Sequence, residues 1–219
     1  WAAAFVEAAL AVGYEACEDQ NRAGAHGVGP HAMNKLDERR VSAAEAFLTP
    51  EVRALPNLEI HPGTLVHRVA FDGRRAIGVD VEHDGEQYRI EGRVVLCAGA
   101  VATPGILLRS GIGATDDVAR VGANLRIENE WVAKQLLDHP GVAFFVRKRW
   151  GGPQTVEDPL IQTVLRYGSA IHGSKYPNDV QIQPGSKIIF PPRQFRGGSI
   201  MSAIGKPFGK GIIRFDSDD

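Results

Sequence analysis

Residues 94–113 read VVLCAGAVATPGILLRSGIG, and we expect this stretch to decide the fold. The run Val94–Ala98 is unbroken and apolar, which predicts a strand buried on both faces, with Cys97 as a small buried thiol. Thr103-Pro104 has the chemistry of a helix start, because threonine caps free backbone amides and proline suits the first helical position. Gly111 predicts the end of that helix. The stretch therefore predicts a strand, a short turn and a helix.

The turn between this strand and this helix consists of three small residues, Ala98, Gly99 and Ala100. Small side chains allow a flat or phosphorylated group to approach the backbone closely, and a helix start directs backbone amides at such a group. A tight turn that binds nothing has the same residues, so the local pattern alone leaves both interpretations open.

The same stretch resembles the second signature of the glucose–methanol–choline (GMC) oxidoreductases. That signature has a small-residue turn, Thr-Pro, two aliphatic residues and Ser-Gly-aliphatic-Gly, found here as Gly99-Ala100, Thr103-Pro104, Leu107-Leu108 and Ser110–Gly113. A pattern of this length with so many defined residue types is specific. Segments on both sides resemble the family in order and spacing: Asp19–Asn21, Arg40–Ala44, Phe47-Leu48, Pro56–Ile60, Val66–Val69, Arg75–Val79 and Asp138–Pro140.

The resemblance implies a mixed fold, α+β and α/β, in which part of an FAD-binding nucleotide fold is joined to part of an antiparallel-sheet substrate domain. We expect residues 1–140 to be the remainder of the FAD-binding domain with a β-hairpin region, and residues 141–219 to be part of the substrate-binding domain. The implied reaction oxidises a small-molecule alcohol to a carbonyl compound, with hydride transfer from carbon to FAD.

The resemblance also implies candidate cofactor-binding residues. Val66 matches the position where the family's backbone meets the adenine end of FAD, and Ala98, Gly99 and Ala100 form the turn near the same cofactor. His139 matches a position close to the flavin, although a hydrogen-bonded structural histidine is the interpretation we favour from the residue type alone.

Departures from the family pattern matter as much as the agreements. No Gly-x-Gly-x-x-Gly fingerprint lies between a predicted strand and a predicted helix. The family's catalytic histidine lies beyond a strand that resembles Gly211–Phe215, and the sequence stops at Asp219. Ala133 and Gln135 stand where the family usually has Gly and Asn, which adds bulk at an expected flavin contact. We therefore expect a central fragment that has no catalytic residue of its own and is inactive by itself.

Periodicity and turn signals predict the remaining elements. Asp72-Gly73 and Asp84-Gly85 are typical hairpin turns on either side of one strand. We expect a long loop at 18–40 and a sheet that is mostly antiparallel after residue 140. Expected helices lie at 1–14, 42–48 with a capping box, from 50, and at 116–121, 128–137 and 160–167; expected strands lie at 58–61, 64–71, 75–83, 88–93, 142–146, 180–183, 187–190, 200–204 and 212–215.

Composition and charge exclude several classes of function. The chain of 219 residues has a formal net charge of −1, and its densest basic run, Arg147–Arg149, is short, so we expect no nucleic-acid partner. No apolar run approaches the roughly 18 residues of a membrane span, and no basic segment precedes the apolar start as in a secretory signal. Cys17 and Cys97 suggest no disulfide framework and favour a cytoplasmic setting. His26 and His31 lack the further ligands of a metal site.

Two alternatives to an alcohol oxidoreductase stay open at this point. A lyase or another non-redox enzyme on the same scaffold fits the fold, because a fold does not define a reaction. A non-catalytic binding module derived from the fold fits as well. The sequence does not name the alcohol, the electron acceptor or the oligomeric state.

Overall fold

The computed structural model describes residues 1–37, 39–147, 160–170, 177–186, 188–190, 193–195 and 197–217. The chain forms two compact units. Unit 1 comprises Trp1–Ser42 and Asp138–Phe208, and unit 2 comprises Ala43–Leu137 and Gly209–Asp219. These two units do not coincide with the predicted domains 1–140 and 141–219. The assignment of these domains to the cofactor and to the substrate stays a prediction. In the described ranges, no helix is long and apolar enough to cross a membrane.

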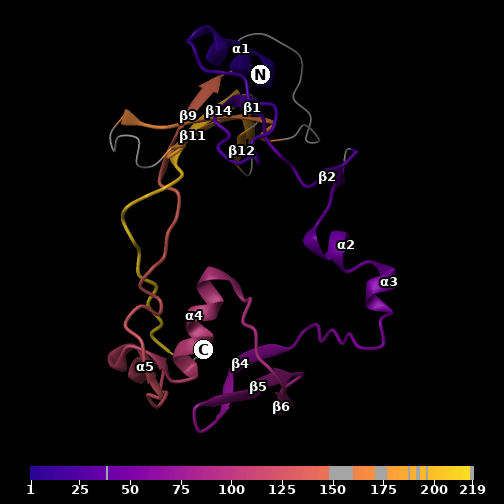
Figure 1. Ribbon diagram of the computed structural model, residues 1–219, viewed down its shortest axis with the longest axis vertical. Helices are drawn as coiled ribbons and strands as arrows, with labels where there is room; N and C mark the ends of the chain where they lie inside the picture. Colours follow the sequence, from indigo (N-terminus) through magenta and orange to yellow (C-terminus); the bar gives the residue numbers. More distant parts are fainter. Residues whose placement is uncertain are drawn as a thin grey trace. The chain divides into compact units, whose positions relative to one another are not determined.

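Unit 1 contains a five-stranded antiparallel sheet, which confirms the sheet expected in the later part of the chain. Its order is β1-β10-β11-β14-β9. Figure 1 labels β1, β11, β14 and β9 of this sheet. The edge strand β1 (Gly27–Pro30) comes from the predicted long loop. The other strands are β10 (Thr163–Tyr167), β11 (Val180–Gly185), β14 (Gly197–Ile204) and β9 (Gly141–Arg147); the short pairs are β2 (Lys35–Leu36) with β3 (Arg39–Arg40) and β12 (Ile188–Phe190) with β13 (Arg193–Phe195).

Helix α1 (Ala2–Ala11) confirms the amphipathic helix expected at the start, and Gly13 follows its end with a φ of 98°. Its buried Ala9 packs in one cluster with Val28 and Leu165, so the helix contacts the first two strands of the sheet. This cluster is the hydrophobic core of unit 1.

Two positions in the predicted loop require glycine for steric reasons. Cys17 N donates to the Val28 carbonyl at 2.8 Å, and Val28 N donates to the Glu15 carbonyl at 2.9 Å, so β1 runs directly against the preceding segment. A Cβ at Gly29 would collide with the Cys17 carbonyl, and one at Gly27 would collide with the Glu15 carbonyl. These glycines therefore permit close backbone packing.

Unit 2 is built around a three-stranded meander, β4 (Leu65–Asp72), β5 (Arg75–His83) and β6 (Glu86–Glu91). Both predicted hairpin turns are confirmed, because Gly73, Asp84 and Gly85 all have positive φ. The remaining elements are α2 (Ala43–Phe47), α3 (Pro50–Arg53), α4 (Gly99–Arg109), α5 (Thr115–Arg120), and β7 (Ile112–Gly113) paired in parallel with β8 (Ile127–Glu128).

The end of α4 is tied to the free edge of β4. Ser110 Oγ accepts a hydrogen bond from Val69 N at 2.8 Å and donates one to the Ile106 carbonyl at 2.6 Å. Buried Leu108 and Val118 belong to one cluster of apolar side chains in the core of this unit. Helix and meander are therefore held by both polar and apolar contacts.

The expected strand at Val94–Ala98 is wrong. A strand needs a hydrogen-bonded neighbour, and within the described residues this segment has none. Val95 is 78% exposed, and Cys97, expected to be buried, is exposed as well. The predicted cap at Thr103 is also wrong, because α4 begins at Gly99 with Ala98 as its N-cap and carries Pro104 inside. Gly111 does follow the helix end, with a φ of 81°.

Four further predictions of local structure are wrong. The helix expected at 160–167 is strand β10, because its β-branched residues pair with β1 and β11. The segments 58–61 and 212–215 are irregular because no strand lies beside them in the described part. The helix expected at 128–137 is absent, because Glu128 belongs to β8 and the described residues after it form turns in which Ala133 has a φ of 62°.

Candidate cofactor-binding groove

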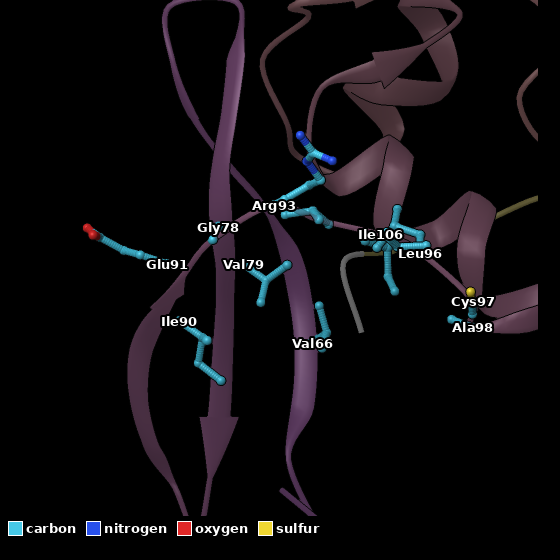
Figure 2. A pocket seen from close by; sticks show the side chains of 13 residues that line it. Val66, Gly78, Val79, Ile90, Glu91, Arg93, Leu96, Cys97, Ala98 and Ile106 are labelled. Atoms are coloured by element: carbon cyan, nitrogen blue, oxygen red, sulfur yellow. The ribbon is translucent and has the colours of Figure 1, made fainter. Parts of the chain in front are cut away.

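A groove of about 430 Å³ lies in unit 2 between the meander and the segment that leads into α4. Figure 2 shows Val66 and Val79 on the strands, and Leu96, Ala98 and Ile106 on the segment and helix beyond them. The groove thus brings together two parts of the chain that sequence analysis had connected only through the family resemblance.

The wall formed by the meander is apolar because the strand register places apolar residues on the same face of the sheet. Val66 pairs with Val81 and Val79 pairs with Ile90, and residues paired across strands share a face of the sheet. Val81 is fully buried, whereas Val66 and Ile90 are partly open to the groove. One face of the meander therefore has both a packed part and a part available to a ligand.

The opposite wall alternates along the chain. Val94 and Leu96 are half-buried, whereas Val95 and Cys97 are exposed. This period of two is typical of extended backbone with one covered side. The segment therefore keeps the conformational pattern of a strand although it has no strand partner in the described residues.

The turn into α4 is open. Gly99 has a φ of 82°, and a Cβ built on it meets no atom within 4 Å. Ala98 provides no side-chain cap, so the first backbone amides of α4 have no side-chain acceptor at this position. The bend after Cys97 is consequently free of bulk, as its composition had suggested.

The predicted site residues fall into two groups. Val66 and Ala98 line the groove, and Gly99 and Ala100 continue directly from Ala98 into α4. His139 does not line the groove and belongs to unit 1.

Within unit 1, His139 is held by two hydrogen bonds. Its backbone N donates to Asp138 Oδ1 at 2.7 Å, and its Nδ1 lies 3.1 Å from the Ile204 carbonyl. This histidine therefore ties the start of the sheet region to the end of β14.

Val79, Ile90 and Ile106 also line the groove and were not predicted from the sequence. The alternation of apolar residues in two adjacent predicted strands was an available signal for the first two. Ile106 gave no such signal, because only the tertiary structure turns this part of α4 toward the meander.

Charged side chains gather on the other face of the meander. Asp80 accepts hydrogen bonds from Arg89 at 2.7 Å and from Arg68 at 2.9 Å, and these bonds, that of Arg89 first, lower the pKa of Asp80. Hydrogen bonds from Gln87 and then His67 likewise lower the pKa of Glu82. The meander therefore separates an apolar face that borders the groove from a charged face.

No group of three or more His, Cys, Asp or Glu residues is arranged to hold a metal ion in the parts of the chain with described positions. The groove itself contains one carboxylate, Glu91, which points away from Ile106 and Ala98 in Figure 2. Arg93 lines the groove as well, so the groove offers a ligand apolar contacts, backbone groups and one guanidinium side chain.

The family model for GMC oxidoreductases matches residues 2–140. The chain belongs to the GMC oxidoreductase family. This confirms the family expected from residues 98–113, and with it the association with FAD-dependent oxidoreductases.

Curated relatives are similar to this chain in sequence over most of its length. A GMC-type oxidoreductase of Rhodococcus erythropolis is 33% identical over 97% of this chain, and the pyridoxine 4-oxidase of Microbacterium luteolum is 34% identical over 98%. An oxygen-dependent choline dehydrogenase of Serratia proteamaculans is 39% identical over 62% of the chain. The chain covers 44%, 44% and 25% of these three relatives, so it spans less than half of their length.

Solved structures agree as well. The structure of a pyridoxine 4-oxidase from Mesorbium loti matches the whole chain with a TM-score of 0.89 at 28% identity, and the chain covers 44% of it. An FAD-dependent oxidoreductase from Chaetomium thermophilum matches 98% of the chain, which covers 48% of it, with a TM-score of 0.77 at 18% identity, a likeness of fold alone. The expected mixed fold, with an FAD-binding part and an antiparallel-sheet part, is thereby confirmed.

Proposed function

We propose that this chain is part of a flavoprotein that oxidises a small alcohol to a carbonyl compound, and that its groove holds the adenosine half of FAD. The observation that carries the proposal is the presence of Val66 and Ala98 on one groove, next to the open bend at Gly99. When bound, FAD supplies the acceptor for a hydride. The residues of this chain bind and orient it.

The groove residues fit the adenosine half of this cofactor. Adenine is flat and largely apolar on its faces, and Val66, Val79 and Leu96 provide apolar surfaces on two sides. The small residues Ala98 and Gly99 leave the main chain accessible. We infer that Gly99 and Ala100 lie close to the cofactor for the same reason.

His139 is retained as a proposed flavin-side residue. Its Nδ1 is occupied by the Ile204 carbonyl, which holds the ring in place, while the Nε2 atom of this exposed side chain has no partner in the described residues. A fixed imidazole with one free nitrogen can donate to or accept from a ligand.

We infer that the group that removes the hydroxyl proton comes from polypeptide outside residues 1–219. General-base catalysis requires a group within hydrogen-bond reach of the substrate hydroxyl. None of the histidines with described positions lines the groove, and the relatives are more than twice as long as this chain. The alcohols named for relatives, choline and pyridoxine, are the first substrates to test.

We infer that the same additional polypeptide covers Val95 and Val101. They are 78% and 64% exposed; Val95 lies in the extended segment before α4, and Val101 lies in the first turn of α4. Large exposed apolar side chains near each other in the chain are typical of a surface that normally packs against another element.

The test uses the full-length protein. Bound flavin that bleaches anaerobically when choline, pyridoxine or a simple primary alcohol is added supports the proposal. Bound flavin that no alcohol reduces contradicts alcohol oxidation and favours the lyase, and a colourless, folded protein that does not take up added FAD contradicts the cofactor assignment.

Substitution of Ala98 tests the position of the cofactor. Ala98→Leu adds bulk in the groove and should weaken FAD binding by about tenfold or more, because an adenine ring and the added side chain compete for the same space. Ala119→Leu, on an exposed position of α5, adds the same bulk elsewhere and should leave FAD binding unchanged. Equal affinities in the two variants would place FAD outside this groove.

A further inference from the structure

A second hollow in unit 2, of about 260 Å³, shares no lining residue with the FAD groove. We call it the arginine hollow. It lies where the register of β4 shifts between Val66 and Arg68, and the end of α4 and the loop after α5 complete it. His67, Arg68, Asp80, Gln87, Arg109 and Gly122 are among the residues that line it.

The carboxylate that lines this hollow, Asp80, already has cationic partners. Asp80 is bound by Arg68 and Arg89, and Glu82 is bound by Gln87 and His67. Asp80 is therefore paired with two guanidinium groups, whereas Glu82 does not line the hollow and is held by the side chains of Gln87 and His67. A further residue adds positive charge to the hollow.

That residue is Arg109. Its Nε donates to the His67 carbonyl at 2.8 Å, and in the described part of the chain no carboxylate pairs with its guanidinium. The Nε end of the planar guanidinium is thus bonded to the bulged strand, while its two terminal nitrogens have no acceptor among the described residues. Arginine held in this way is suited to the bidentate binding of an oxyanion.

The rim of the arginine hollow is open on the side of Gly122. This residue has a φ of 70°, and a Cβ built on it meets no atom within 4 Å. A side chain introduced at this rim position therefore meets no steric clash.

We propose that the arginine hollow binds a small phosphate-type oxyanion, with Arg109 as the principal ligand and Arg68 at the rim. The anion would balance the guanidinium of Arg109, which no carboxylate pairs with in the described part of the chain. This inference goes beyond the proposed function and does not rest on it, since the hollow and the FAD groove have separate linings.

The experiment is a calorimetric titration of the full-length protein, as isolated, with inorganic phosphate. We expect saturable binding at one site with a dissociation constant in the millimolar range or below. Arg109→Gln should weaken it by about tenfold or more, because it removes charge-assisted hydrogen bonds. Arg74→Gln, in the exposed turn between β4 and β5, is the matched control and should bind phosphate as the parent protein does.

A second variant does not depend on how well Arg109→Gln folds. Gly122→Asp introduces a carboxylate at the rim, in a left-handed conformation that aspartate tolerates, and should weaken phosphate binding about threefold or more by repulsion. The absence of saturable phosphate binding, or parental affinity in Gly122→Asp, would overturn the proposal. Tighter, Arg109-dependent binding of malonate than of phosphate would overturn the phosphate assignment in favour of a dicarboxylate.

Discussion

Unit 1 and unit 2 assemble their sheets by different routes. In unit 2 the three strands of the meander follow one another along the chain through two tight turns. In unit 1 the edge strand β1 pairs with β10, so that Gly27 lies opposite Arg166. The meander depends on local turn chemistry, whereas the larger sheet depends on contacts between distant segments.

This difference shows where each unit is vulnerable. A strand that pairs with a segment far away in the sequence needs close backbone packing. In β1 this packing depends on glycines, because a side chain at these positions would collide with neighbouring backbone. A meander closed by local turns depends more on its helix contact and its cross-strand pairs. Changes in each unit should therefore affect that unit first.

The largest effect is expected at Gly29. Gly29→Val forces a side chain into the Cys17 carbonyl, a backbone group that cannot move without breaking the hydrogen bonds of β1. We expect the free energy of unfolding of unit 1 to fall by at least about 4 kcal/mol, as for the most damaging single changes. Hydrogen exchange of the full-length protein should show β1 and β10 opening while β4 and β5 stay protected.

The control for this variant is Gly24→Ala. Gly24 has a positive φ, 73°, but a Cβ there meets no atom within 4 Å, so only the backbone cost of about 1 kcal/mol applies. If Gly29→Val unfolds at the same temperature as this control, close packing of β1 is not what holds unit 1 together.

The next effect is expected at Leu108, which is 1% exposed in the core of unit 2. Leu108→Ala leaves a cavity beside Val118 and should cost about 3 kcal/mol. Thermal unfolding combined with hydrogen exchange should locate the loss in unit 2. Leu55→Ala, at a half-exposed position after α3, should cost less than about 1 kcal/mol, and an equal cost for both would argue against a core at Leu108.

A smaller effect is expected at Asp80. Its pKa in the folded protein lies below the ordinary value of 3.8, so its stabilising contribution is complete above that value and is lost as the pH falls through the lowered pKa. Its partners Arg68 and Arg89 are 60% and 45% exposed, which limits the contribution to about 1 kcal/mol.

The measurement is the pH dependence of thermal unfolding for the parent protein and Asp80→Asn. The two curves should be separated at neutral pH and converge in acid, where Asp80 is protonated in both states. Asp84→Asn, in an exposed turn, is the control for loss of a carboxylate. Parallel curves at all pH values would mean that the bonds to Arg68 and Arg89 add no stability.

The smallest effect is expected at Tyr167, whose ring centroid lies 5.4 Å from that of Tyr14. Burial, with the neighbouring Tyr14 and Asp179 as lesser causes, raises the pKa of Tyr167 above 10.0. Ionisation of its phenol is therefore unfavourable in the folded state, and unit 1 should lose stability above pH 10.0. Tyr167→Phe should change the free energy of unfolding by less than about 0.5 kcal/mol at neutral pH. It should also reduce the loss of stability in alkali, and thermal unfolding measured as a function of pH checks both effects. An unchanged alkaline profile would show that another group governs it.

Residues 98–113 carried enough information to predict the family, and the turn dipeptides predicted the meander, because both depend on residues that are neighbours in sequence. Val66 and Ala98 were predicted as cofactor-binding residues through the family resemblance, and the fold places both on one groove. Their contact with FAD stays a prediction. The segment Leu160–Tyr167 was predicted wrongly, because its conformation depends on partners far away in the chain.

By itself, the sequence determined the helix at the start, the hairpin turns and the small-residue bend, since these follow from the preferences of single residues and short spacings. Only the tertiary structure decided that β1 joins β10, that Val94–Ala98 has one exposed side, and that Arg109 is anchored on the bulge of β4. Each of these depends on contacts between backbone groups and side chains that are far apart in the sequence. The conformational preferences of neighbouring residues do not determine such contacts.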